Sequence, residues 1–508
     1  MVLKKGRLFS LLNAFTLLIT SSTSFAIKAE IFRKLDIESE YRITQPVIAA
    51  DILNKQGKEL ISFTVDAEGQ RWLVIYALEG SSSYAEVNRI ALKQEFLNYD
   101  LADYEEGKPQ KLYFSTHSSL WTLEEGAKDS SLSFKKLFNI DSIFVDKNPQ
   151  FITRGSYVKN LNGDGFDDFM FSGFDAVTVY LGESKSTWKK QVLPIPPNVK
   201  RYRERITYEQ REVFLVDMNL DKTTDIVLAK EGELSAFFLK KNGFYEAEPR
   251  SFSIESSISG VDWWDKRDEN GEGLDQSDLV YRKLEELKDI NNDGVTDMIV
   301  RFTQSSGVLD RTNDYEVYFG AANNDGIKFK DIADTVIRAD GTLTGLEFVD
   351  IDEDKTFEVL LSGFDIGLSE IIGALLAGSI DQNVFLFRLD NKDKYSRKPV
   401  VSKEVELSFS LTSGQSGSPV VQLADVSGDN IKDLILSDGE DKLKIFHGIN
   451  GKKSFQRKSK SFDMKLPTDG NTVFVDDLNM DGKDDILMKY GPLDGADMLN
   501  RFTVLFAK

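Results

Sequence analysis

A nine-residue pattern of oxygen-bearing side chains recurs along the chain and constrains the fold more than any other feature. Its last copy reads D-L-N-M-D-G-K-D-D over residues 477–485, with oxygen donors at positions 1, 3, 5 and 9. The copies begin at residues 160, 217, 289, 350, 425 and 477, so 52 to 75 residues separate their starts. Repeats of this length indicate supersecondary units that share a continuous core.

The candidate metal ligands are the residues at positions 1, 3, 5 and 9 of the six copies. Position 5 is always aspartate, and position 9 is always an acid. The predicted set is Asn160, Asn162, Asp164, Asp168, Asp217, Asn219, Asp221, Asp225, Asp289, Asn291, Asp293, Asp297, Asp350, Asp352, Asp354, Glu358, Asp425, Ser427, Asp429, Asp433, Asp477, Asn479, Asp481 and Asp485.

The chemistry of this spacing favours Ca²⁺, a hard cation that takes six to eight oxygen ligands. The opening D-x-N-x-D-G resembles an EF-hand loop, but an EF-hand needs a glutamate at position 12 and flanking helices. Here the acid is at position 9 and strand-like runs flank the loop. We expect up to about six calcium ions, bound more weakly where Lys222, Lys355 or Asn430 replaces glycine at position 6. Asn160 and Ser427 each remove a carboxylate from their loops.

Each repeat contains four runs with the β-branched and aromatic enrichment of strands. One run enters the loop, one leaves it, and a third follows. The fourth, outer run is predicted at 133–137, 327–330 and 454–457 in three of the units. Four strands per repeat predict an all-β propeller of four-stranded blades. Two worn copies, at 51–60 and 103–112, raise the count to eight blades; seven is the alternative if one worn unit is an insertion.

The two ends of the chain complement each other. The last repeat stops after its third run, Arg501–Phe506, and lacks an outer strand. The segment Ile31–Leu35 resembles the predicted outer strand Ser133–Leu137. The sequence therefore predicts that the N-terminal strand completes the last blade and closes the ring.

Residues 1–26 have the pattern of a secretory signal peptide. Lys4, Lys5 and Arg7 precede a largely apolar run, and Ser24 and Ala26 offer small residues before a cleavage site. We expect residues 27–508 to form a single propeller domain exported to the periplasm or outside the cell. An uncleaved N-terminal anchor is the alternative. No later stretch reaches the roughly 18 apolar residues that a membrane helix needs.

The composition excludes several classes of site and partner. The 508 residues include no cysteine, which excludes disulfide scaffolds and thiolate metal sites, and only two histidines, which argues against a zinc enzyme. The net charge of -20 argues against nucleic acid as the main partner, because phosphate binding needs a basic surface.

Taken together, the six loops and the repeated Ser172–Asp175 and Ser362–Asp365 (S-G-F-D) resemble the FG-GAP/VCBS repeat family. This family of calcium-loop propellers also includes the head of integrin α subunits. The resemblance covers nearly all of residues 30–508. It implies the fold and calcium binding, whereas propellers of this kind serve in adhesion, as lectins, as scaffolds and as polysaccharide lyases.

Three insertions, at 194–211, 262–278 and 365–379, fall in connections on the side of the blades away from the loops. The first carries Lys200, Arg203 and Tyr208, the second Trp263 and Trp264, and the third a short helical pattern. A surface of loops on a rigid scaffold is the favoured place for a ligand. The alternatives are structural: basic residues paired with acids, tryptophans that pack a blade, and a helix that covers strand ends.

Two functional classes remain open. The first, which we favour, is a non-enzymatic binding, adhesion or scaffold module for a glycan or a surface or envelope protein. The second is a secreted lyase acting on acidic polysaccharide, because some rhamnogalacturonan lyases are similar propellers. No G-x-S-x-G, H-E-x-x-H or other catalytic motif is present.

Overall fold

The computed structural model describes residues 31–508 except 54, 103–107, 126–130, 146–147, 185, 203–204, 268–271, 308–309, 340, 365–378, 391–393 and 411–414. The predicted signal peptide at 1–26, part of the worn copy at 103–112 and the helical pattern within 365–379 therefore lie outside the described residues. Within the described part, no helix is long and apolar enough to span a membrane.

The chain is all-β, built mainly from four-stranded antiparallel sheets that follow one another along the sequence. Those of the first half are β2 (Arg42–Ile43), β3 (Ile48–Ala50), β4 (Glu59–Val65), β5 (Arg71–Glu79) and β6 (Ser83–Ala91); β7 (Asn98–Leu101), β8 (Leu112–Ser115), β9 (Ser119–Glu125) and β10 (Leu132–Asn139), with β11 (Thr153–Arg154) added in parallel to β7; β12 (Val158–Lys159), β13 (Asp168–Ser172), β14 (Val177–Ser184) and β15 (Thr187–Leu193); and β18 (Phe214–Val216), β19 (Asp225–Lys230), β20 (Glu233–Phe237) and β21 (Arg250–Ser253).

In the second half the sheets follow one another in the same way, except that the first two are connected by one pair of residues. These two sheets come first. They are β23 (Leu279–Lys288), β24 (Asp297–Gly307), β25 (Asp310–Tyr318) and β28 (Thr335–Ile337), with β22 (Ile258–Ser259) added in parallel; and β29 (Thr342–Val349), β30 (Glu358–Phe364), β31 (Ser379–Phe387) and β32 (Val401–Ser410), with β33 (Gln415–Ser416). The single pair Asn313–Thr342 joins these two. The next sheet is β34 (Val421–Ala424), β35 (Asp433–Ser437), β36 (Lys442–Phe446) and β37 (Lys460–Asp463).

The last sheet combines both ends of the described chain. It contains β38 (Val473–Asp476), β39 (Asp485–Lys489), β40 (Arg501–Ala507) and, as its outer strand, β1 (Phe32–Glu38). The register pairs Phe32 with Ala507 and Glu38 with Arg501. Three short 3₁₀ turns, η1 (Gly470–Thr472), η2 (Pro492–Asp494) and η3 (Ala496–Met498), lie in the connections of this sheet.

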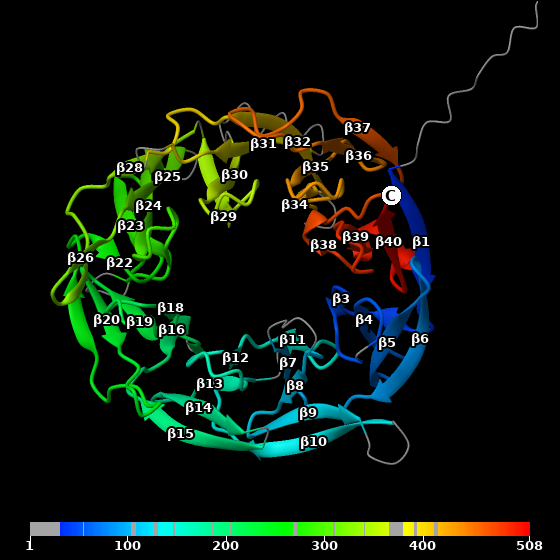
Figure 1. The fold of residues 1–508 in the computed structure, drawn as a ribbon, viewed down its shortest axis with the longest axis horizontal. Helices are drawn as coiled ribbons and strands as arrows, with labels where there is room; N and C mark the ends of the chain where they lie inside the picture. The colour runs from blue at the N-terminus through cyan, green and yellow to red at the C-terminus, as the bar shows by residue number, and fades with distance from the viewer. Residues whose placement is uncertain are drawn as a thin grey trace, which may run out of the picture.

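The sheets are arranged radially around a central space, as Figure 1 shows, with strands such as β29, β34 and β38 near the centre and β1, β10 and β15 at the rim. Radial repetition of four-stranded sheets is the architecture of a β-propeller. Two short hairpins, β16 (Asn198–Tyr202) with β17 (Arg205–Glu209) and β26 (Ala321–Asn323) with β27 (Gly326–Lys328), are additions to this plan.

The hydrophobic core is divided into clusters between consecutive sheets. Val227 and Leu234 of one sheet, for example, pack with Met298 and Val300 of the next. A comparable cluster joins the first and last sheets, where Leu60 and Val74 pack with Leu487, Val504 and Phe506. Burial of apolar side chains therefore stabilises the contacts between neighbouring sheets.

Two of the predicted outer strands are wrong. Residues 326–328 pair with β26 rather than with β25, whose outer partner is β28. Residues 454–457 form no strand: Phe455 makes an isolated bridge with Gly448, and the outer strand is β37. The alternating apolar residues that suggested these strands are buried between sheets instead, with Phe329 and Phe455 only 4% and 5% exposed. The predicted outer strand at 133–137 is confirmed as part of β10.

Candidate metal loops and ligand pocket

The six repeated loops share one backbone conformation, and each joins the first strand of a sheet to the second. Positions 4 and 6 have positive φ in every copy. At position 6 the residues are Gly165 (φ 80°), Lys222 (69°), Gly294 (83°), Lys355 (69°), Asn430 (64°) and Gly482 (85°). At position 4 they are Gly163 (68°), Leu220 (63°), Asn292 (58°), Glu353 (55°), Gly428 (74°) and Met480 (58°). The turn therefore imposes the left-handed conformation even where no glycine is present.

The side chain at position 1 holds the turn together. In the loop at 289–297, Asp289 accepts hydrogen bonds from the backbone N–H groups of Asp293 at 3.1 Å and Gly294 at 2.8 Å. The aspartates at position 1 of the 217, 350, 425 and 477 loops make the same two contacts. Asn160 has a single side-chain oxygen, and this oxygen accepts from the backbone N–H of Gly163 at 3.0 Å.

The acid at position 9 lies at the base of each loop and is buried, with an exposed fraction of 0% or 1% in all six copies. Asp297 shows the usual arrangement: it accepts from the backbone N–H of Ile290 at 3.0 Å and of Gly320, beyond the third strand, at 3.0 Å. Burial raises the pKa of Asp168 to about 6 and the pKa values of Asp225, Asp297, Glu358 and Asp485 to about 7.

The structure brings positions 3 and 5 of four loops into contact as well. The amide nitrogens of Asn162, Asn219, Asn291 and Asn479 lie 2.8 to 3.2 Å from the carboxylate two residues on.

The sequence did not lead us to predict two tyrosines that form hydrogen bonds with the backbone of these loops. The hydroxyls of Tyr245 and Tyr395 donate to the carbonyls of Thr224 and Phe357, at position 8 of their loops. A buried tyrosine shortly after the third strand was the available signal.

The loop at 425–433 contains buried polar atoms without a partner. Asp433 accepts from Gly448 N–H at 2.7 Å and lies 3.2 Å from His447 Nδ1, through the same carboxylate oxygen. Its other oxygen, Oδ2, and His447 Nε2 have no hydrogen-bond partner within the described part of the chain. Leaving a buried carboxylate oxygen unsatisfied is costly, and Asp352 Oδ1 of the loop at 350–358 shares this condition within the described residues, so it does not distinguish the two loops.

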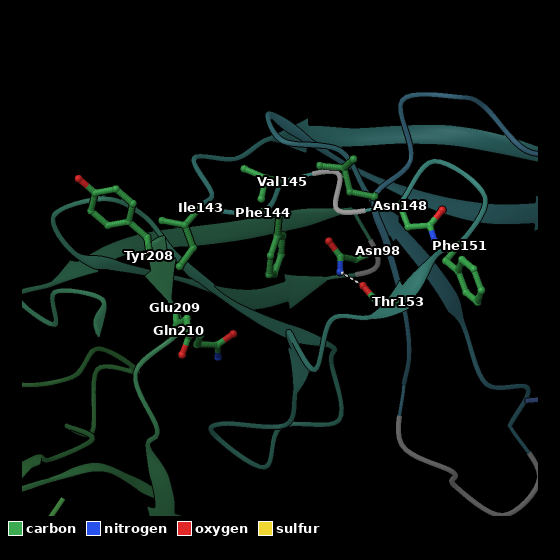
Figure 2. A pocket seen from close by; sticks show the side chains of 11 residues that line it. Asn98, Ile143, Phe144, Val145, Asn148, Phe151, Thr153, Tyr208, Glu209 and Gln210 are labelled. Atoms are coloured by element: carbon green, nitrogen blue, oxygen red, sulfur yellow. Dashed lines mark hydrogen bonds between the residues drawn. The ribbon is translucent and has the colours of Figure 1, made fainter. Parts of the chain in front are cut away.

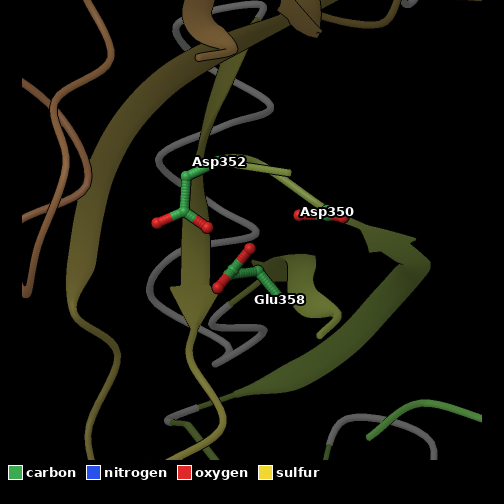
Figure 3. Close-up of side chains that lie close together, drawn as sticks. All are labelled: Asp350, Asp352 and Glu358. Carbon is green, nitrogen blue, oxygen red and sulfur yellow. The ribbon is translucent and has the colours of Figure 1, made fainter. Parts of the chain in front are cut away.

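The loop at 350–358 differs from the others, because an arginine lies among its acids. Arg388 Nε is 2.9 Å from Glu358 Oε1, and a terminal nitrogen of Arg388 is 2.8 Å from Asp352 Oδ2. Asp350, Asp352 and Glu358 each place an oxygen within 4.8 Å of the others, and Figure 3 shows Asp352 and Glu358 turned toward one another.

A pocket of about 500 Å³ lies at the ends of the strands away from the loops. It is lined by Leu97, Asn98, Ile143, Phe144, Val145, Asn148, Phe151, Thr153, Tyr208, Glu209 and Gln210. Asn98 is the first residue of β7, whereas the worn copy of the pattern at 103–112 follows Leu101, the last residue of that strand. The hairpin β16–β17, inserted between β15 and β18, supplies the other wall.

Both aromatic rings and amides are part of the lining of this pocket. Figure 2 shows Phe144 between Ile143 and Asn98, with Tyr208 and Phe151 on opposite sides. Tyr208 is 41% exposed and Phe151 38%. Asn98 Nδ2 donates to Thr153 Oγ1 at 2.7 Å, which fixes one amide at the wall. Ring faces beside oriented amides are typical of sites that bind small polar molecules with an apolar face.

The predicted basic residues beside the pocket are already engaged where the structure describes them. Lys200 Nζ lies 2.6 Å from Glu209 and 2.9 Å from Asp265. The side chain of Tyr202 and all of Arg203 lie outside the described residues. Of the two tryptophans, Trp263 is buried at 8% exposure against Leu279 and Tyr281, whereas Trp264 is 47% exposed. Trp263 therefore packs the fold, as the structural alternative predicted.

No protein family matches the sequence, and no curated protein does. Among solved structures, a lectin from Agrocybe aegerita that recognises non-reducing terminal N-acetylglucosamine has a TM-score of 0.39 at 13% identity, over 84% of this chain and 95% of the lectin. A protein from Lactobacillus plantarum has a TM-score of 0.35 at 12% identity, over 72% and 89% of the two chains. AofleA from Arthrobotrys oligospora has a TM-score of 0.27 at 14% identity, over 73% and 92%. At these values the likenesses carry no argument about what the present chain binds.

Proposed function

We propose that this protein is an exported, calcium-stabilised propeller of eight blades that binds a neutral glycan in the pocket beside Tyr208. The N-terminal sequence pattern supports export, and the donor sets of the loops support calcium. The pocket is the observation that carries the binding role. A protein ligand and an acidic polysaccharide substrate are the competing outcomes.

Closure of the ring by the N-terminal strand is supported by contacts that recur between units. The backbone N–H at position 8 of one loop donates to the position 2 carbonyl of the preceding loop, from Phe357 to Ile290 at 3.0 Å and from Lys432 to Ile351 at 2.9 Å. Lys58, in the worn loop of the first unit, makes the same contact with Leu478 in the last unit, at 2.8 Å. We infer that the first and last blades meet as the internal blades do.

Calcium is proposed for the five loops in which no arginine or lysine of the described residues forms an ion pair with a ligand: those beginning at 160, 217, 289, 425 and 477. Their donors are carboxylate, amide and hydroxyl oxygens, which Ca²⁺ prefers. The net charge of -20 adds a general reason, because bound divalent cations reduce the self-repulsion of an acidic chain.

A neutral sugar fits the pocket better than an anionic one. Aromatic rings bind the apolar face of a sugar ring, while amides exchange hydrogen bonds with its hydroxyls. The charged residue of the lining, Glu209, is negative and its partner Lys200 is shared with Asp265, so no cation of the described lining is left over for a uronate. This balance disfavours the lyase alternative, which needs a cation to neutralise a substrate carboxylate.

The test is binding of a panel of neutral and acidic oligosaccharides to calcium-loaded protein, with unsaturated products recorded in parallel. We expect a neutral oligosaccharide to bind, and Tyr208→Ala to weaken it at least about tenfold, or about 1.4 kcal/mol. Trp264→Ala is the matched control, because it removes an exposed aromatic ring outside the pocket lining. Equal binding by Tyr208→Ala and the unaltered protein would contradict the pocket assignment, and unsaturated product would indicate a lyase.

A further inference from the structure

The loop at 350–358 keeps all four predicted ligands and yet contains a positive charge supplied by the chain itself. Arg388 directly follows β31, the third strand of its sheet. In the other five loops the strand register puts Leu181, Phe238, Phe319, His447 or Phe506 at this place, and the residue that follows, Gly182, Leu239, Gly320, Gly448 or Ala507, gives its backbone N–H to the position 9 acid at 2.7 to 3.1 Å. In the loop at 350–358 the side chain of Arg388 itself contacts the position 9 acid, with Nε 2.9 Å from Glu358 Oε1.

The contacts of Arg388 coincide with the predicted calcium ligands. Besides Glu358 at position 9, the guanidinium contacts Asp352 at position 3 at 2.8 Å and approaches Asp354 at position 5 to 3.8 Å. Its side chain is only 16% exposed, and those of Asp352 and Glu358 are 10% and 1% exposed. Ion pairs shielded from water in this way are screened little by salt.

Arg388 gives a direct physical explanation for the close approach of Asp352 and Glu358, because it pairs with both, whereas Asp350 accepts backbone N–H groups instead. Carboxylates within 4.8 Å of one another repel, and they come together where a cation lies between them. Among the described residues this is the one such group of three acids, and it is also the loop that contains an arginine. A calcium ion bound to Asp352 and Glu358 would lie beside the guanidinium and be repelled by it.

We propose that Arg388 is a built-in replacement for calcium, so that the loop at 350–358 does not bind the ion and the protein binds calcium only in other loops. The inference rests on the proposed function in one respect, that the sibling loops hold calcium. A further contact supports a structural role for this charge: Arg388 donates to the carbonyl of Gly451, in the turn between β36 and β37 of the next sheet, at 3.1 Å. The arginine thus links two neighbouring sheets through the loop.

The proposal predicts that removing the arginine creates a calcium site. Arg388→Gly removes the guanidinium that pairs with Asp352 and Glu358 and leaves these two acids without that cation. We expect mature Arg388→Gly protein to bind one more calcium ion per chain than the unaltered protein, measured by elemental analysis after equilibrium dialysis against calcium chloride. Adding Asp352→Ala to this variant should remove the extra ion.

Two matched variants control the experiment. Arg282→Ala removes a comparable arginine, paired with Glu316 at 2.8 Å outside any loop, and should leave the calcium count unchanged. Asp354→Ala and Asp481→Ala alter the same position 5 in two loops. We expect Asp481→Ala to lose one ion and Asp354→Ala to lose none.

An unchanged calcium count in folded Arg388→Gly would overturn the proposal, and so would the loss of one ion in Asp354→Ala. The second comparison decides the question even if Arg388→Gly does not fold. These results can be told apart from a failure of the proposed calcium binding in the sibling loops. In that case the unaltered protein and Asp481→Ala would both bind no calcium. A single ion gained by Arg388→Gly would still support the role of Arg388.

Discussion

At the scale of single residues, the residue at position 6 of each loop determines how much backbone strain the loop contains. All six residues at this position have φ between 64° and 85°, but only three are glycine. A side chain in the left-handed region costs roughly 1–2 kcal/mol relative to the right-handed one, whereas glycine enters it freely. Lys222, Lys355 and Asn430 therefore carry local strain that the rest of the loop offsets.

We expect Lys222→Gly to raise the free energy of unfolding by about 1 kcal/mol, because the strain removed exceeds the extra backbone entropy of glycine in the unfolded chain. Urea unfolding of the two proteins measures the difference. Lys483→Gly, at position 7 of another loop, is the control: its φ is not positive, so glycine there should destabilise slightly. A destabilised Lys222→Gly would show that the lysine side chain contributes more than its backbone strain costs.

The spacing of the donors predicted a repeated tight turn, and in four loops the side chains at positions 3 and 5 do lie in contact. Spacing could not predict the second partner of the position 9 acid. Asp168 accepts from Gly182 and Asp297 from Gly320, 14 and 23 residues downstream, and such contacts depend on the pairing of strands. Arg388 was missed for the same reason, since it lies 30 residues beyond Glu358.

At the scale of elements, strands were predictable where pairing and burial follow the same alternation. β10 and β1 were found in this way. The segments at 327–330 and 454–457 alternate as well, but Phe329 and Phe455 fill the space between sheets rather than the face of a paired strand. Alternation reports burial, and it cannot distinguish these two uses of a buried side chain.

The pairing of β1 with β40 allows a direct test of how much the outer strand stabilises the fold. Phe32 is 1% exposed and packs in the cluster between the last two sheets, so we expect Phe32→Ala to cost about 3–5 kcal/mol. Lys34→Ala is the control on the same strand, with a partly exposed side chain and an expected effect within about 0.5 kcal/mol. Thermal unfolding measures both.

Deletion of residues 27–40 extends this prediction to the whole strand. Loss of β1 leaves β40 as an unpaired edge and exposes the cluster around Phe32. The melting temperature should fall sharply. An unchanged melting temperature would contradict a stabilising role for the N-terminal strand.

At the scale of the whole molecule, the sequence predicted a ring of four-stranded sheets because one loop pattern marks the same junction in each unit. The pocket beside Tyr208 could not be predicted, because its walls come from β7, the connection after β10 and the hairpin β16–β17, which are far apart in sequence. The insertion at 194–211 did indicate the side of the ring on which to look.

Calcium bound in the loops that begin at 160, 217, 289, 425 and 477 is proposed to stabilise the propeller. A ligand that binds only the folded state stabilises it by about 2.7 kcal/mol per site when its free concentration is a hundred times the dissociation constant. The most direct measurement is the melting temperature of mature protein in excess calcium and in excess chelator. We predict a markedly higher melting temperature with calcium and a smaller effect of magnesium, which demands shorter, octahedral coordination. Identical melting temperatures with calcium and with chelator would contradict the account.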